Sequence, residues 1–344
     1  MSATLQDVAN LANVSVATAS LALNGKTVKA QTRIKVLEAA QKLNYVANSI
    51  GKNLISGKTN TVGLYIFNTK DETGLTEECS YFYNILRGVL HVTEKYGYSF
   101  HFDIGYWEDS GSNTQFNQKV YSHSFDGVIV MPYYVHHYFF MDTLEKLHFP
   151  YVIYNPNIHV DPAKCIIVDN YAGAQKATDY LIDIGFTRIG FINGPENHFD
   201  AINRGRGFYN ALIKRGLQVY NEDIVNSDFT IQGGYLAMQQ IINNHPTLPE
   251  ALFCANDYMA AGAMKALYQM GYQVPRDISI IGYDDTDIAR GIFPALTTIQ
   301  NPTFQMGQLA AERLFDIILG RNSPQESIIL KPELIVRESC RRNS

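Results

Sequence analysis

Residues 4–25 read TLQDVANLANVSVATASLALNG, and this stretch decides the fold of the N-terminal part of the chain. Thr4 is followed three residues later by Asp7, a capping-box-like pattern that begins a helix. An Asn-Val-Ser sequence at residues 13–15 interrupts that helix, and Ser15 begins a second helix that ends at an Asn-Gly pair. The stretch therefore predicts two short helices joined by a tight turn.

A third helix is predicted over residues 31–43, where Ile34, Leu37, Ala40 and Leu43 lie on one face. Two short helices and a tight turn, braced by a third helix, make a helix-turn-helix unit. The second helix of such a unit enters the major groove of DNA, and its N-terminal side chains reach the base edges. The head is therefore predicted to bind operator DNA, and the alternative is an inert three-helix bundle.

The predicted DNA contacts of the head divide into base contacts and phosphate contacts. Valine and alanine can meet a thymine methyl group and threonine can hydrogen-bond a base edge, so the base contacts are Val16, Ala17 and Thr18. Phosphate contacts position the head without reading sequence, and they are assigned to Ser15, Ser20 and Asn24.

The charge of the chain is unevenly distributed. The 344 residues carry a net charge of −5, but residues 1–58 contain seven lysines and arginines against two acidic residues. The head therefore carries a charge of +5 and the remainder a charge of −10. A basic head on an acidic body favours a polyanion partner at one end only.

The composition excludes several other classes of protein. Hydrophobic residues make up 46% and charged residues 18%, which fits two or three globular domains. No apolar run approaches the roughly 20 residues that span a membrane, and no signal-peptide pattern begins the chain. The four cysteines lie far apart, which argues against zinc motifs and disulfide frameworks and fits the cytoplasm. We expect no membrane contact, no metal and no cofactor.

From residue 61 onward, apolar strands alternate with amphipathic helices. Such alternation predicts an α/β body of parallel sheets wrapped by helices, and two series of strands predict two lobes. The first series is predicted at residues 62–67, 98–104, 127–131 and 151–154, and the second at residues 166–168, 189–192, 252–255 and 278–282. Helices are predicted at residues 82–96, 172–184, 204–215, 233–243, 258–270 and 304–319.

Polar side chains follow four of the predicted strands, at Asn155, Asn193, Asn256-Asp257 and Asp284-Asp285. Ligands of open parallel sheets bind outside the carboxyl ends of the strands, so these side chains favour a polar ligand site in one crevice between the lobes. The alternative for any one of them is a helix cap or a turn, most of all for Asn256 or Asp257.

The whole chain resembles the lactose-repressor/galactose-repressor (LacI/GalR) family of bacterial transcription regulators. In the head, the resemblance rests on TLQDVA at 4–9, VSVAT at 14–18, LNG at 23–25 and LNY at 43–45. In the body, it rests on VDN at 168–170, GRGF at 205–208, AND at 255–257, GYDD at 282–285 and PALTTI at 294–299. It implies a helix-turn-helix head, a hinge and a periplasmic-binding-protein-like body of doubly wound parallel sheets, whose lobes the chain crosses three times.

The resemblance also implies domain boundaries. These are a DNA-binding domain at 1–46, a hinge at 47–60, an N-terminal lobe from 61–161 with 302–322, and a C-terminal lobe from 162–301 with 323–344.

The resemblance adds residues to the predicted DNA contacts. Thr4 joins the set in the head, and Leu21 stands where the family usually has an arginine, so we expect a different operator preference at that base pair. In the hinge, the family pattern is a helix that folds on operator DNA and wedges a leucine into the minor groove. The matching leucine here is Leu54, with Lys52 nearby for the DNA backbone. Two further departures are Lys29 in place of a capping serine and Ala47 in place of a proline.

The resemblance implies an effector held between the lobes. Some positions match effector-binding positions directly, some match aromatic residues that pack on the ligand, and two lie on a loop that varies with the ligand. The predicted effector-binding residues are Tyr81, Phe82, Asn155, His198, Asp200, Arg204, Phe229, Asn256 and Asp284.

A small carbohydrate is the preferred effector. Sugar hydroxyl groups donate and accept, so they suit Asp, Asn and Arg partners, while sugar C–H faces lie on aromatic rings. A purine or a phosphorylated metabolite is the alternative effector. Two other classes stay open, a sugar-binding protein without a regulatory role and an enzyme, but the chain lacks His-Glu-x-x-His and Gly-x-Ser-x-Gly motifs, and no catalytic residue is predicted.

The predicted assembly is a homodimer on a near-palindromic operator, where the protein acts as a repressor. By the resemblance, the dimer contact involves residues 86–91 and the helix at 304–319 of the N-terminal lobe.

Overall fold

The computed structural model describes residues 3–24, 27–45, 58–68, 79–106, 110–133, 139–244, 247–322 and 324–342. The hinge contacts predicted at Lys52 and Leu54 lie outside these residues. The chain divides into two units, Met1–Asn60 and Thr61–Ser344.

The head consists of three helices, α1 (Leu5–Ala12), α2 (Val16–Leu23) and α3 (Ala30–Lys42), as the sequence predicts. The capping box of α1 is present, because the Asp7 amide donates to Thr4 Oγ1 at 3.3 Å and the Thr4 amide donates to Asp7 Oδ2 at 2.8 Å. Asn13, with φ 52°, ends α1, and Ser15 Oγ caps α2 by accepting from the Thr18 amide at 3.1 Å. No side-chain hydrogen bond caps α3 at Lys29.

The predicted packing face of the third helix is wrong in part. Ile34 and Leu37 are 55% and 49% exposed, and the buried residues of α3 are Val36, Ala39 and Ala40. The reason is size, since alanines let α1 and α2 approach α3 closely, whereas a face of large aliphatic residues would hold them apart. The head therefore has a small core.

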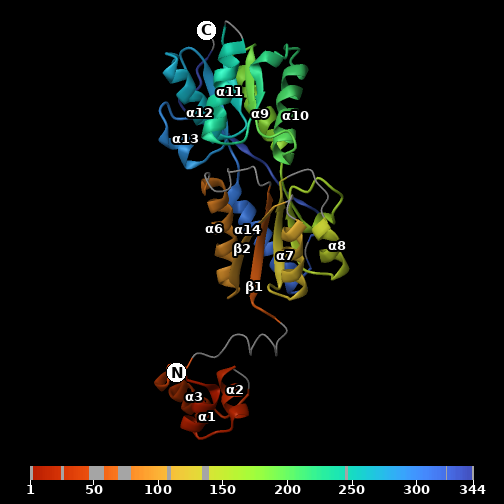
Figure 1. Ribbon diagram of the computed structural model, residues 1–344, viewed down its shortest axis with the longest axis vertical. Coiled ribbons are helices and arrows are strands. Elements are labelled where there is room, and N and C mark those ends of the chain that lie inside the picture. The colour runs from red at the N-terminus through yellow and green to blue at the C-terminus, as the bar shows by residue number, and fades with distance from the viewer. Residues whose placement is uncertain are drawn as a thin grey trace. The chain divides into compact units, whose positions relative to one another are not determined.

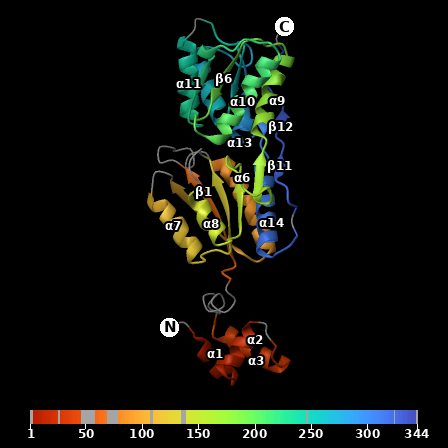
Figure 2. The same ribbon diagram turned by 90° about the vertical axis from the view of Figure 1, so that its right-hand side faces the viewer.

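The N-terminal lobe is a parallel sheet between two pairs of helices (Figures 1 and 2). Its strand order is β11-β5-β4-β3-β1-β2, with β1 (Thr61–Asn68), β2 (Ser99–Tyr106), β3 (Gly127–Pro132), β4 (Tyr151–Tyr154), β5 (Cys165–Val168) and β11 (Ile328–Leu330). The core on one face packs against α6 (Cys79–Lys95) and α14 (Thr303–Ile318), and the core on the other against α7 (Ser110–Tyr121) and α8 (Phe139–Lys146). A short 3-10 helix at Pro162–Lys164 precedes β5.

The C-terminal lobe repeats this architecture. Its strand order is β12-β10-β9-β8-β6-β7, with β6 (Ile189–Asn193), β7 (Ile224–Asn226), β8 (Ala251–Cys254), β9 (Ser279–Asp284), β10 (Thr297–Gln300) and β12 (Glu333–Ile335). The pair α9 (Asn170–Asp183) and α10 (Phe199–Lys214) packs together, as does the pair α11 (Ile231–Asn244) and α12 (Asp257–Gln269) (Figure 1). Two short helices, a 3-10 helix at Asn221–Asp223 and α13 (Asp287–Gly291), complete the lobe. Only the β10–β12 pairing of the described strands is antiparallel.

The sheet topology corrects two predicted lobe boundaries. The strand Cys165–Val168, predicted to begin the second series, pairs with β4 and belongs to the N-terminal lobe. The strand Ile328–Leu330 pairs with Cys165–Val168 in the same sheet. The chain therefore crosses between lobes after residue 168 and after residue 330, later than the predicted boundaries at 161/162 and 322/323. The strands are short, and their apolar pattern alone does not say which sheet they join.

Candidate functional site

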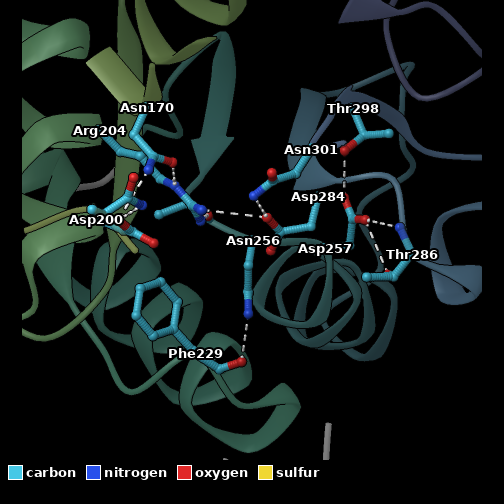
Figure 3. Close-up of polar contacts among 12 residues, drawn as sticks. Asn170, Asp200, Arg204, Phe229, Asn256, Asp257, Asp284, Thr286, Thr298 and Asn301 are labelled. Carbon is cyan, nitrogen blue, oxygen red and sulfur yellow. Dashed lines mark hydrogen bonds and ion pairs between the residues drawn. The ribbon is translucent and has the colours of Figure 1, made fainter. Parts of the chain in front are cut away.

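The carboxyl ends of the strands meet in a crevice between the two lobes. Here α10 places Arg204 and Asp200 beside Asn170, the first residue of α9, and the end of β9 places Asp284 on the other side of the guanidinium (Figure 3). The N-terminal lobe contributes Asn155, directly after β4. Four residues predicted to bind the effector thus lie in one hydrogen-bonded cluster with Asn170.

Arg204 is the centre of this cluster and is 3% exposed. Its Nε donates to Asn170 Oδ1 at 2.9 Å, one terminal nitrogen donates to the Ala255 carbonyl at 2.5 Å, and the other pairs with Asp284 Oδ1 at 3.3 Å. The guanidinium carbon lies 3.9 Å from the centre of the Tyr283 ring. Burial opposes the charge, but Asp284 and the other acidic neighbours outweigh it, so the pKa of Arg204 is above its usual value. Burial raises the pKa of Asp284, and Arg204 opposes that shift.

Asp200 is the second buried carboxylate of the crevice. Its Oδ1 accepts from Asn155 Nδ2 at 2.9 Å and from Asn170 Nδ2 at 3.0 Å, so one oxygen joins the two lobes. Burial raises the pKa of Asp200, while Arg204 opposes the shift. A second bond between the lobes runs from the Phe199 amide to the Tyr133 carbonyl at 2.8 Å.

His198 is the N-cap of α10, and its Nδ1 accepts from the Asp200 amide at 3.2 Å. Its ring stacks on Tyr133 with centroids 5.1 Å apart and meets the edge of Phe229 at 5.0 Å. Burial, together with the nearby Arg204 charge, lowers the pKa of His198 to about 3. The imidazole is therefore neutral at physiological pH and serves as an acceptor and an aromatic surface.

A small cavity of about 10 Å³, room for about one water molecule, lies beside Asp200 and Asn155. Its lining is aromatic and apolar apart from a few polar groups, and consists of Tyr81, Met131, Pro132, Tyr133, Tyr154, Asn155, Phe199, Asp200 and Met306. Phe82 lies behind this wall, with its ring edge-on to Tyr81 at 5.2 Å and to Tyr133 at 5.9 Å. Ligand pockets have volumes of about 300–1,000 Å³, so a sugar ring can enter here only if the two lobes move apart.

Asn256 occupies a capping position, the alternative that the sequence left open. Its Oδ1 accepts from the Met259 amide at 2.8 Å, and its Nδ2 donates to the Phe229 carbonyl at 2.7 Å. It thereby fixes the turn that carries Phe229. Its neighbour Asp257 accepts from the Thr286 amide, the Thr286 hydroxyl and the Thr298 hydroxyl at 2.7, 3.0 and 2.5 Å (Figure 3).

Three of the predicted effector residues have left-handed backbone conformations. The φ angles are 36° at Asn155, 68° at Phe229 and 104° at Asp284. Such conformations are strained for residues other than glycine and cluster at functional sites. The Phe229 ring also lies against Gly194, where an added Cβ would approach it to 2.1 Å. A side chain at Gly194 would therefore displace this ring.

Sequence reasoning did not assign Asn170, Tyr133 or Tyr154 to the site. Asn170 lies within the VDN stretch at 168–170, which served only to mark the family resemblance. Tyr154 is the last residue of β4, one position before Asn155, and its place at the carboxyl end of a strand was the available signal.

The predicted base contacts of the head lie on an accessible helix face. Val16, Ala17 and Leu21 are exposed and Thr18 is half-buried, and a helix that enters a groove requires such an accessible face. Some of the polar groups also serve the head itself. The Ser15 hydroxyl contacts the Thr18 hydroxyl at 2.8 Å, and Asn24 Nδ2 donates to the Ser20 hydroxyl at 3.3 Å. The Thr4 hydroxyl likewise donates to Asp7 at 2.7 Å.

In the part of the chain that the structure describes, no group of three His, Cys, Asp or Glu side chains is arranged to hold a metal ion. None of the helices in that part is both long enough and apolar enough to cross a membrane.

The fold is that of a helix-turn-helix domain joined to a periplasmic-binding-protein-like body, and comparison with known proteins agrees. The family of bacterial regulatory proteins named lacI matches residues 4–48, and a periplasmic binding protein-like domain matches residues 178–340. A probable HTH-type transcriptional repressor, ExuR of Bacillus subtilis, is 31% identical over 340 residues, 98% of each chain. The chain therefore belongs to the lacI family of bacterial regulatory proteins.

Other relatives are similar over the same length. The ribose operon repressor of Haemophilus influenzae is 32% identical over 98% of both chains, and the repressor PurR of Klebsiella pneumoniae is 33% identical over 98% of this chain and 96% of its own. The lac repressor dimer bound to operator and an anti-inducer has a TM-score of 0.86 at 25% identity, covering 98% of this chain and 99% of that one. The regulator CelR in complex with cellobiose has a TM-score of 0.74 at 28% identity, with the same coverage.

Proposed function

We propose that this protein is a transcriptional repressor that binds a specific operator through α2 and whose operator affinity is controlled by a small carbohydrate. The observation that carries the proposal is the buried Arg204–Asp284–Asp200 cluster between two lobes, in a chain whose head exposes the N-terminal face of α2. Each relative described above is named a repressor or a regulator.

The polar groups of the crevice suit a sugar better than a purine. Carboxylates, amides and a guanidinium form paired hydrogen bonds with adjacent hydroxyl groups. A purine would need two parallel aromatic faces. Neither Phe82 nor Phe229 lines the cavity beside Asp200, and Phe229 meets the His198 ring edge-to-face at 5.0 Å. CelR is titled as a cellobiose complex, which supports a sugar, and the name PurR keeps a purine as the rival ligand.

Control by an effector follows from the bonds that join the lobes. Asn155 to Asp200 and Tyr133 to Phe199 are contacts that exist only when the lobes are close together. A ligand that contacts both walls changes the free energy of one lobe arrangement relative to another. Only such a difference in affinity can shift operator binding.

The expected homodimer has a suitable surface on the N-terminal lobe. Tyr83, Leu90 and Phe304 are large apolar residues exposed on α6 and α14. The Arg87 guanidinium lies over the Tyr83 and Phe304 rings, at 5.6 and 5.4 Å. A face of this kind is typical of an interface, where aromatic residues and arginine are enriched.

The test is selection of duplex sites from a random library with the full-length chain. We expect enrichment of a near-palindromic site whose binding weakens steeply with salt, because phosphate contacts release counterions. A neutral sugar added to the complex should change operator affinity. Recovery of no preferred duplex over scrambled controls would contradict the repressor function.

A further inference from the structure

The pocket between the lobes contains a hydroxyl group that the protein itself does not satisfy. Tyr154 is 2% exposed and lines the pocket, and its hydroxyl has no hydrogen-bond partner among the residues that the structure describes. A buried polar group without a partner costs free energy and calls for an explanation. Burial raises the pKa of Tyr154, so the group keeps its proton and can both donate and accept.

The C-terminal lobe contributes a carboxylate to the same pocket. Asp200 is 4% exposed and also lines the pocket. The amides of Asn155 and Asn170 both converge on its Oδ1, which leaves Oδ2 as an acceptor for a bound molecule. The Tyr154 hydroxyl of the N-terminal lobe and the Asp200 carboxylate of the C-terminal lobe thus line one small cavity.

The charges that the described residues place around this cavity do not favour an anion. Arg204 is the buried cation of the crevice, and its carboxylate contact is Asp284, at 3.3 Å. His198 is neutral, because burial and Arg204 lower its pKa to about 3. Burial raises the pKa of Asp200, but in either protonation state this group offers no positive charge to a carboxylate or a phosphate. Among the residues that the structure describes, a ligand anion would therefore meet carboxylates without a spare cation.

We propose that Tyr154 and Asp200 form the subsite that sets ligand specificity, by hydrogen-bonding a hydroxyl group of an uncharged sugar and by rejecting sugars that carry a carboxylate or a phosphate. This inference rests on the proposed function and names the ligand class of the same crevice. Such a subsite discriminates neutral sugars from uronic acids and sugar phosphates that have the same ring.

Titration calorimetry of the full-length chain tests this with matched sugars. The panel contains glucose, galactose, mannose, ribose and cellobiose, with glucuronate, galacturonate and glucose 6-phosphate as the charged partners. We expect a neutral sugar to bind at least roughly tenfold tighter than its charged partner. Tyr154→Phe should weaken that binding by roughly threefold to tenfold, the value of one hydrogen bond. Asp200→Asn should reduce the ratio of the affinity for the neutral sugar to the affinity for its charged partner.

The matched control is Tyr65→Phe, which removes a buried tyrosine hydroxyl from the same sheet but on the face toward α7 and α8. It should bind sugar as the wild type does. A charged sugar that binds tighter than its neutral partner overturns the proposal, as does equal binding by the two Tyr→Phe variants, or a wild type that binds no neutral sugar of the panel. Operator binding without sugar is measured separately, so the repressor function and the ligand class fail independently.

Discussion

Replacing Arg204 by alanine should destabilise the body of the protein strongly. The guanidinium is 3% exposed and donates to Asn170, the Ala255 carbonyl and Asp284. Without it, the buried Asp284 carboxylate keeps a hydrogen bond from Asn301 Nδ2 at 3.2 Å but loses its cation. Breaking a buried pair by removing one partner costs about 3–5 kcal/mol. Because native stabilities are about 5–15 kcal/mol, this is a large fraction of the total.

The assay is urea unfolding followed by far-ultraviolet circular dichroism, with linear extrapolation to water. The matched control is Arg215→Ala, at the C-terminal end of the same helix. That arginine pairs with Asp183 at 2.8 Å but its side chain is 45% exposed, so its loss should cost less than about 1 kcal/mol. Similar losses of unfolding free energy for the two variants would refute the assignment of Arg204 as the central buried cation.

The same variant should respond to pH in a defined direction. Burial already raises the pKa of Asp284 when Arg204 is present, and removal of the cation raises it further. The folded variant then retains a proton that the unfolded chain releases above its ordinary carboxyl pKa. Its unfolding free energy should therefore fall as pH rises from 5 to 7. The loss of unfolding free energy caused by Arg204→Ala should then be larger at pH 7 than at pH 5. A loss that is independent of pH would contradict this account of Asp284.

Four further substitutions test other parts of the molecule. His198→Asn keeps a capping acceptor but removes a group whose pKa is lowered to about 3 in the folded protein. As the pH falls from 6.5 to 5, the wild type should therefore lose roughly 2 kcal/mol more unfolding free energy than the variant, because only the unfolded wild type gains a proton at this position. Lys29→Ser should stabilise the head by about 0.5–1 kcal/mol in thermal unfolding, because no side chain caps α3. Leu21→Arg should shift site selection toward guanine at one base pair, with a discrimination of about 1–3 kcal/mol. Leu54→Ala, at the predicted hinge wedge, should weaken specific but not non-specific binding in a mobility-shift assay; unchanged specific affinity would refute the wedge.

The head could be predicted almost element by element because its signals are local. A capping box, a left-handed Asn13 and a serine cap each act within four residues, so the sequence places the helix ends to within about one residue. The packing face of α3 was the exception. Which side of a helix is buried depends on how closely the neighbouring helices approach it. Apolar periodicity predicts Ile34 and Leu37 as core residues, but the buried contact of α3 is made by Ala39 and Ala40 together with Val36.

The body could be predicted as two α/β lobes but not in its connections. Strands of three or four residues such as Ile328–Leu330 are fixed by pairing with a distant strand, and no local signal says which sheet they join. The site shows the same division. Residues at strand ends could be placed in the crevice from the sequence. The Tyr154 hydroxyl could not be assigned to the site, because only the structure shows that it is buried without a hydrogen-bond partner among the described residues.

Under the proposed function, the position of the cluster would let a bound ligand act on both lobes. Asn301, in the segment that crosses from β10 to α14, donates its amide to Asp284 at 3.2 Å. Asn170 follows the first crossing directly, and the Asp169 amide donates to the Leu330 carbonyl of the third crossing at 2.9 Å. A ligand that displaces Arg204 or Asp284 therefore acts on the connections themselves, without a long chain of contacts. Moving the lobe equilibrium from 1:99 to 99:1 requires about 5.5 kcal/mol of differential affinity, the order of two to four hydrogen bonds to charged groups. Under the proposed function, Arg204 and Asp200 make enough hydrogen bonds in this cluster for a ligand to bias the two lobe arrangements.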